Sequence, residues 1–163
     1  MNKTVAFGAA FAIILIALPA RADKPGTIGI GLGSATSASG LSGKYYTSPT
    51  MAFQAVVGSF GAAGLNRYSE YSGFGVSVDA LVENSALVKN EFFSLDWNFG
   101  LGAGIGLLSD TLSVAAAGVV GLEFNFVPVP VDLVVEYRPT LGLVPDLHFE
   151  PIGFTGHLRY YFQ

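Results

Sequence analysis

The chain lacks cysteine and carries few charges. None of its 163 residues is cysteine, which excludes disulfide scaffolds, cysteine nucleophiles and zinc sites built from thiolates. Only 12% of the residues are charged while 51% are hydrophobic, and such a composition is too apolar for a disordered chain. The length favours one domain, since domains commonly hold about 100–200 residues.

Long apolar runs are missing beyond the N-terminal segment. After residue 22, no stretch of about 18 residues is free of both charge and repeated glycine, so spanning helices are not expected there. Before it, one lysine and the charge-free stretch 4–18 lead to Ala20-Arg21-Ala22, a pattern that signal peptidase cleaves. The alternative, a short membrane anchor, is disfavoured because the stretch is shorter than a membrane span. We therefore expect residues 1–22 to be a signal peptide and residues 23–163 to form one mature domain.

The mature chain is acidic. Lys3 and Arg21 leave with the signal peptide, so six Lys and Arg face 12 Asp and Glu, a formal charge of −6. An acidic exported protein binds the phosphates of nucleic acids poorly. No nucleic-acid partner is expected.

Apolar residues recur at every second position along the mature chain. The clearest case runs from Phe93 to Leu107, where large apolar residues alternate with Ser94, Asp96, Asn98 and glycines. This period predicts β-strands. Eight segments show it, the first four more weakly: 27–33, 40–47, 51–59, 73–83, 93–107, 111–126, 131–138 and 154–162. No proline falls within the middle of any of them, as expected because proline cannot donate a ladder hydrogen bond.

Eight antiparallel strands predict an all-β fold, a closed up-and-down barrel. A soluble lipocalin-like barrel has its apolar side chains inside, whereas an outer-membrane barrel turns them toward lipid. Several segments reach the 10 or so residues that a tilted strand needs to cross a bilayer. Aromatic residues also gather near the two ends of the expected strands, as in the girdles of membrane barrels. They are Tyr45, Phe53, Phe93, Phe124, Phe126, Tyr160 and Phe162 toward one end and Phe74, Tyr137 and Phe154 toward the other. We therefore expect a transmembrane barrel.

Two segments carry a resemblance to known proteins. Residues 153–163, GFTGHLRYYFQ, resemble the C-terminal signal of bacterial outer-membrane barrels, although such signals usually end on the aromatic residue and this chain ends in Gln163. Residues 40–46, GLSGKYY, with the turn at 47–50, resemble a hairpin in a functionally undefined group of small bacterial barrels.

The mature chain as a whole is similar to small eight-stranded outer-membrane proteins of the OmpA-type and OmpX-type class. The resemblance implies the outer membrane of a Gram-negative-type envelope and assembly by the barrel-assembly machinery through the C-terminal strand. It implies no catalytic residues.

Charged residues fall mainly on the parity that faces the interior of such a barrel. Isolated charges there are costly, so these groups are expected to pair with one another in an interior charge network. Its predicted members are Lys44, Asp79, Glu83, Asp96, Glu123, Asp132, Glu136, Arg138, His157 and Arg159. Most of them cluster in the expected periplasmic half and would form a polar plug there. An eight-stranded barrel has little more room than its side chains need, so a general diffusion pore is disfavoured.

Small residues dominate the interior parity of the other half. They suggest an outward-opening cavity for a small amphiphile, lined by Gly102, Gly104, Ala115, Ala117 and Arg138. The alternatives are that the barrel flattens there, or that a connection at 62–72 or 141–150 folds inward. The long connections, 60–72 and 140–152, are expected outside the cell, where membrane barrels carry their longer loops.

The sequence offers little support for catalysis, and no cofactor or metal is expected. Its glycine-rich stretches have glycine at every second residue and precede no evident helix, unlike dinucleotide-binding loops. His148 and His157 lack a third metal ligand at a characteristic spacing. Enzymes that modify lipid A use a serine, a histidine and a carboxylate on the lipid-facing surface, whereas His157 has the interior parity.

We therefore expect a monomeric outer-membrane barrel without catalytic activity, porin-like in architecture, with a structural or surface-interaction role. Its expected partners are outer-membrane lipid, lipopolysaccharide and the assembly machinery. The alternatives are, in order, a barrel that binds a small amphiphile, a soluble exported lipocalin-like barrel and a lipid A-modifying enzyme.

Overall fold

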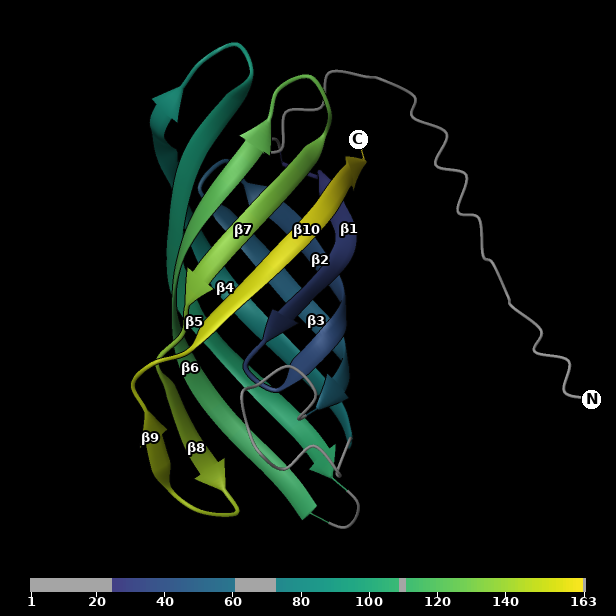
Figure 1. The fold of residues 1–163 in the computed structure, drawn as a ribbon, viewed down its shortest axis with the longest axis vertical. Helices are drawn as coiled ribbons and strands as arrows, with labels where there is room; N and C mark the ends of the chain where they lie inside the picture. The colour runs from purple at the N-terminus through teal and green to yellow at the C-terminus, as the bar shows by residue number, and fades with distance from the viewer. Residues whose placement is uncertain (1–24, 61–72, 109–110, 163) are drawn as a thin grey trace, which may run out of the picture.

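A computed structural model describes residues 25–60, 73–108 and 111–162, and the described residues form only strands and turns (Figure 1). The expected signal peptide and the connection at 62–72 lie outside the described residues. The strands are β1 (Ile28–Ala35), β2 (Ala38–Ser48), β3 (Met51–Phe60), β4 (Gly73–Lys89), β5 (Phe93–Leu108), β6 (Thr111–Phe126), β7 (Val131–Tyr137), β8 (Thr140–Val144), β9 (His148–Glu150) and β10 (Phe154–Phe162).

No helix among these residues has the length and apolarity needed to cross a membrane.

Eight strands close into an antiparallel barrel, which confirms the predicted fold. Each of β1 to β6 pairs with the next, β6 pairs with β7, β7 with β10, and β10 with β1. The closing seam runs from Ile28 opposite Phe162 to Gly33 opposite His157. We call the end that holds the start of β1 and the end of β10 the terminal end, and the opposite end the far end.

The wall of the barrel differs in height around its circumference. β4, β5 and β6 contain 16 or 17 residues each, whereas β1 contains eight and β10 nine. At about 3.3 Å per residue and a tilt of about 45°, β5 spans about 37 Å and β1 about 19 Å. The β4–β5 hairpin extends beyond its expected end because pairing resumes after an irregularity between Asn84 and Val88.

The expected loop at 140–152 contains two further strands. β8 pairs with residues 114–117 of β6, and β9 pairs with β8 alone among the described residues. The β8–β9 hairpin projects from the far end, away from the barrel axis (Figure 1). The predicted long connection therefore contains a short β-hairpin. The alternative of an inward fold at 141–150 was wrong, because nearly every residue of this hairpin is exposed.

Charged and apolar side chains are sorted to opposite faces of the barrel wall. Lys44, Glu136 and Arg159 face the lumen and are at most 1% exposed, whereas Leu101 and Phe154 face outward and are 74% and 69% exposed. Successive side chains of a strand point to opposite faces. The period of two in the sequence therefore produces a polar interior inside an apolar surface.

Candidate functional site

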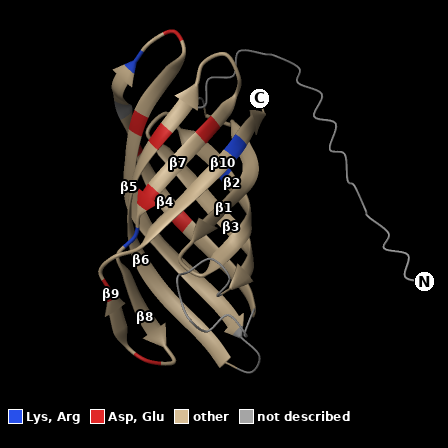
Figure 2. Cartoon of the chain, viewed as in Figure 1, with Lys and Arg blue, Asp and Glu red and all other residues tan. Residues whose placement is uncertain are grey.

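The lumen contains three clusters of buried ion pairs, which together form the candidate functional site. Figure 2 shows the charged positions of the barrel strands in the half nearer the C-terminus and uncharged strands toward the far end. The fully buried members come from β2, β4, β6, β7 and β10 together with Arg138, which directly follows β7. The two halves of the lumen are thus filled by different means.

Lys44 holds the part of the network nearest the terminal end. Its Nζ atom lies 2.9 Å from Glu83 Oε1 and 2.5 Å from Glu123 Oε2. Tyr46 donates a hydrogen bond of 3.0 Å to Glu123 Oε1, and its ring lies 4.8 Å from the Lys44 ammonium. The Lys44 ammonium group is therefore paired with two buried carboxylates, and Tyr46 provides a further hydrogen bond to Glu123.

Arg159 forms the next ion pair. It donates to both carboxylate oxygens of Asp132, with Nη2 2.7 Å from Oδ2 and Nε 3.2 Å from Oδ1. Tyr161 donates to the same carboxylate at 2.6 Å, and its ring lies 6.1 Å from that of Tyr46. The two tyrosines, both 2% exposed, pack with Ala52 and close the lumen at the terminal end.

Arg138 organises the part of the network nearest the middle of the barrel. Its guanidinium group donates to both oxygens of Asp79, at 3.0 and 2.6 Å, and to Glu136 at 2.8 Å. Such bidentate geometry fixes the side chain more firmly than a single contact does. Thr155 donates to Glu136 and accepts from Arg138, which links β10 to the cluster.

Gln54 joins the last two clusters. Its carbonyl oxygen accepts from Arg159, and its amide nitrogen donates to Asp79 and to Glu136 at 3.0 Å each. An amide is suited to this position because it can accept from a cation and donate to two anions at once. Among the described side chains, Gln54 thus connects the Arg159 cluster to the Arg138 cluster by hydrogen bonds.

His157 connects a serine to a carboxylate. Its Nδ1 atom lies 2.9 Å from Ser42 Oγ, and its Nε2 atom lies 3.1 Å from Glu136 Oε2. The order of the three groups is that of a Ser-His-acid triad, but the two ring nitrogens have exchanged partners relative to it. All three side chains are at most 2% exposed, so a substrate cannot approach the hydroxyl in this conformation. The arrangement satisfies buried polar groups, which otherwise cost free energy.

The far half of the lumen is filled by the turn between β1 and β2 and by the ring of Phe60, which lies against Gly106. The turn at Thr36 and Ser37, between β1 and β2, leans across the barrel, and Ser37 is only 3% exposed. A Cβ atom added to Gly104 would lie 2.5 Å from Ser37 Oγ, and one added to Gly75 would collide with the Ser37 carbonyl oxygen. Thr36 accepts a hydrogen bond of 3.3 Å from Arg138. Glycine on the opposite wall thus makes room for the turn.

The predicted cavity residues lie around this turn. Gly102 faces the Asp79 carboxylate, Gly104 faces Ser37, and Ala115, Ala117 and Arg138 are 7%, 4% and 1% exposed. The sequence interpretation did not foresee that the 36–37 turn would occupy space between these small residues. The glycines of β4 and β5 were the available signal, but they do not identify the segment that packs on them.

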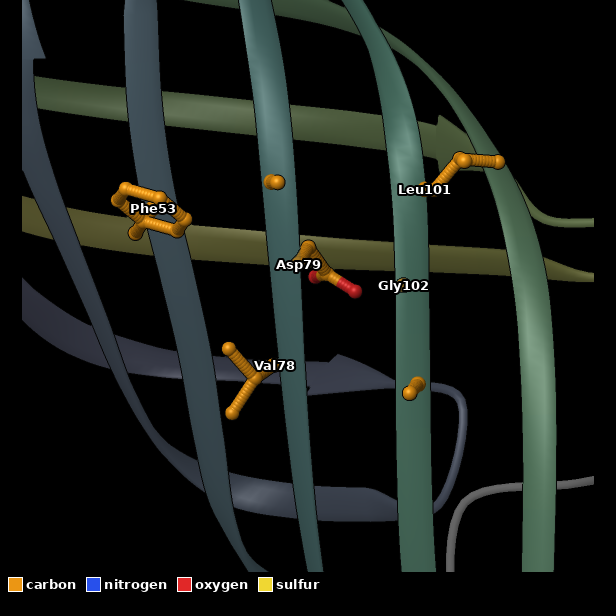
Figure 3. A pocket seen from close by; sticks show the side chains of 7 residues that line it. Phe53, Val78, Asp79, Leu101 and Gly102 are labelled. Carbon is orange, nitrogen blue, oxygen red and sulfur yellow. The ribbon is translucent and has the colours of Figure 1, made fainter.

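A hollow of about 370 Å³ lies elsewhere, among outward-facing side chains of β3, β4 and β5 (Figure 3). Phe53, Val78 and Leu101 surround it, and the small residues Ala80 and Ala103 leave it open. Of the predicted cavity residues only Gly102 lines it. It belongs to the outer surface and not to the lumen.

The structure brings together nine of the ten residues of the predicted charge network, each at most 9% exposed. The tenth, Asp96, is partly exposed and accepts hydrogen bonds from Asn125 and Ser94. Sequence reasoning missed the uncharged partners, which are Ser42, Tyr46, Gln54, Thr155 and Tyr161. All of them share the parity of the charged residues, so that parity was the signal that could have found them.

No group of three or more Asp, Glu or His side chains within the described ranges is placed to hold a metal ion.

No family model, no curated protein and no solved structure matches this chain.

Proposed function

We propose that this chain is an integral outer-membrane β-barrel with a closed interior, which acts as a structural or surface-interaction protein and neither as a diffusion pore nor as an enzyme. One observation carries the proposal: ionisable side chains fill the lumen while large apolar side chains cover the outside. In a soluble lipocalin-like barrel the two faces would be exchanged.

The outer surface supports the proposal in detail. Leu32, Leu101, Leu133 and Leu158 are between 43% and 74% exposed, and no charged side chain lies among the outward positions of the barrel strands in the described residues. A soluble protein rarely exposes a contiguous apolar area larger than a few hundred Å². In a lipid environment these apolar side chains are not exposed to water, so such a surface carries no hydrophobic penalty.

The closed lumen argues against a pore. Tyr46 and Tyr161 close the terminal end, the ion pairs fill the middle, and the 36–37 turn fills the far half. The same packing supports the proposal that the chain is not an enzyme, since Ser42 and His157 are sealed within it. It also gives less support to the alternative of an amphiphile site in the far half, because the turn occupies space there.

Two arginine substitutions test the membrane assignment, one on the outer wall of the barrel and one on the projecting β8–β9 hairpin. Leu101 lies on the outer wall in the middle of β5 and is 74% exposed, so in lipid Leu101→Arg should cost about 2–4 kcal/mol, as expected near the bilayer midplane. Leu147→Arg lies on the projecting β8–β9 hairpin, where Leu147 is 76% exposed. We expect the first variant to lose membrane insertion and the heat-dependent shift of a folded barrel in gel electrophoresis, and the second to keep both.

A soluble barrel would give a different result. The wild-type chain would then fractionate with soluble envelope proteins, and Leu101→Arg would fold as well as Leu147→Arg. Either outcome would contradict the proposal.

A further inference from the structure

The β8–β9 hairpin carries two features that remain unsatisfied in the described structure. β9 pairs only with β8, so one edge of this strand has no partner among the described residues. Large apolar side chains are exposed around it: Leu143 is 44% exposed, Leu147 76%, Phe149 63% and Ile152 75%. The hairpin projects from the barrel instead of packing on it (Figure 1).

An unpaired strand edge beside exposed apolar side chains is unfavourable both in lipid and in water. In hydrocarbon the free N–H and C=O groups of β9 would cost several kcal/mol each, which is why open sheet edges do not occur there. In water the exposed Leu147, Phe149 and Ile152 would leave an apolar edge strand open to association. An added strand from another chain would satisfy the backbone groups and cover the apolar side chains together.

A second copy of this chain does not fit the edge. Antiparallel pairing of β9 with its own copy requires a two-fold axis perpendicular to the sheet. Because the sheet continues the barrel wall, that axis would invert one barrel relative to the other. Two barrels inserted in one membrane have the same orientation. Pairing of β9 with the same strand of a second barrel in the membrane is therefore excluded.

The charges on the hairpin indicate the chemistry of the partner. Asp146 and Glu150 are exposed, and the His148 ring lies 4.0 Å from the Glu150 carboxylate. Within the described ranges the one exposed Lys or Arg is Lys89, at the terminal end of the barrel. The hairpin is thus acidic and apolar, and it lacks the cations that would bind phosphate groups of lipopolysaccharide.

We propose that the free edge of β9 binds an extended segment of another envelope protein, rich in apolar and basic residues, as an additional β-strand. This inference rests on the proposed function, since it locates the surface interaction of a membrane barrel at its far end. Backbone hydrogen bonds supply the affinity, Phe149 and Leu147 contact apolar side chains, and Asp146 and Glu150 contact basic ones.

A synthetic peptide tests the proposal on the full barrel folded in detergent. The probe is a fluorescent peptide of alternating valine and lysine, and its anisotropy measures binding. We expect saturable binding that weakens about tenfold or more in Phe149→Ser and in Glu150→Lys, because a lost apolar anchor or a reversed charge each removes about 1.4 kcal/mol or more. The matched control is Phe92→Ser, since Phe92 is also 63% exposed but lies at the terminal end.

A second probe isolates the edge pairing. The same peptide with N-methyl groups on alternate residues cannot donate the strand hydrogen bonds, and it should not bind. Equal binding of the methylated peptide, an equal loss in Phe92→Ser, or no binding of either peptide would overturn the proposal. Membrane fractionation of the same wild-type chain shows separately whether the proposed function holds. A barrel that inserts but binds no peptide contradicts this inference alone.

Discussion

The two halves of the lumen are filled by different groups. Toward the terminal end the interior is filled by long charged side chains, such as Lys44 and Arg159, that cross from one wall to the other. Toward the far end it is filled by the 36–37 turn, which rests on Gly75 and Gly104, and by the ring of Phe60, which rests on Gly106. Each charged group in the terminal half requires a partner. Packing in the far half requires only that the opposite wall of the barrel lacks side chains.

The difference predicts how each half fails. A side chain removed from the charged half leaves an uncompensated partner behind, and the low polarity around it makes that costly. A side chain added to the glycine half displaces the turn and leaves the rest of the wall in place. Urea unfolding of the barrel in lipid vesicles tests this contrast between the two halves of the lumen. The fluorescence of the single tryptophan, Trp97, reports the transition.

Removing Arg159 should have the largest effect. In Arg159→Met the Asp132 carboxylate keeps only Tyr161 among the side-chain donors to it, and breaking a buried pair in this way costs about 3–5 kcal/mol. The double variant Arg159→Met, Asp132→Leu is the control, since it removes both charges. We expect it to recover most of the lost free energy of unfolding. Equal losses in the single and double variants would contradict a charge-driven effect.

Adding one methyl group to Gly75 should destabilise the far half. The new Cβ atom of Gly75→Ala meets the backbone oxygen of Ser37, and such overpacking costs about 1–3 kcal/mol. In the control, Gly118→Ala, the nearest atom is Pro139 Cγ at 3.5 Å, an ordinary contact. The urea midpoint should fall in the first variant and stay unchanged in the second. A similar midpoint in both would mean that the turn does not rest on Gly75.

The buried turn can also be followed by cysteine labelling, because the natural chain has no cysteine. Ser37→Cys should react slowly with a maleimide, since Ser37 is 3% exposed, whereas Asp146→Cys on the exposed hairpin of the same end should react fast. Adding Gly75→Ala should accelerate labelling at position 37 by about 5–150-fold, as expected for a loss of about 1–3 kcal/mol in local stability. Fast labelling of Ser37→Cys alone would contradict the inward fold.

Thr36→Val should have the smallest effect. It removes a long hydrogen bond of 3.3 Å from Arg138 and leaves the guanidinium group its bonds to Asp79 and Glu136. A loss of about 0.5–1.5 kcal/mol is expected. Thr111→Val, at the exposed start of β6 at the same end of the barrel, is the control for the change of side chain. A loss as large as that of Arg159→Met would show that the two halves are not independent.

The period of two predicted the barrel because it is a local signal. All eight barrel strands lie where the alternation placed them, and their boundaries differ by a few residues except at β4, which continues to Lys89. The same parity placed nine of the ten predicted charges among the buried residues. Both inferences need only neighbouring residues and the geometry of a strand.

Features that depend on distant segments could not be predicted in this way. The 140–152 region contains Pro145 and Pro151 and only short alternation, so its strand character becomes visible only through the pairing of β8 with β6. Thr36 and Ser37 have the composition of an exposed turn, and their burial depends on glycines some 40 to 70 positions away. Gln54 was overlooked because it carries no charge.

The seam between β1 and β10 has a consequence for biosynthesis. Ile28 meets Phe162 across it, so the cylinder cannot close until the final strand has been made. That strand also delivers Arg159 and His157 to carboxylates synthesised earlier, Asp132 and Glu136. Before β10 is in place, these two carboxylates lack the partners that it supplies. Barrel closure and neutralisation of these carboxylates therefore occur together, when the nine residues of β10 take their place in the sheet.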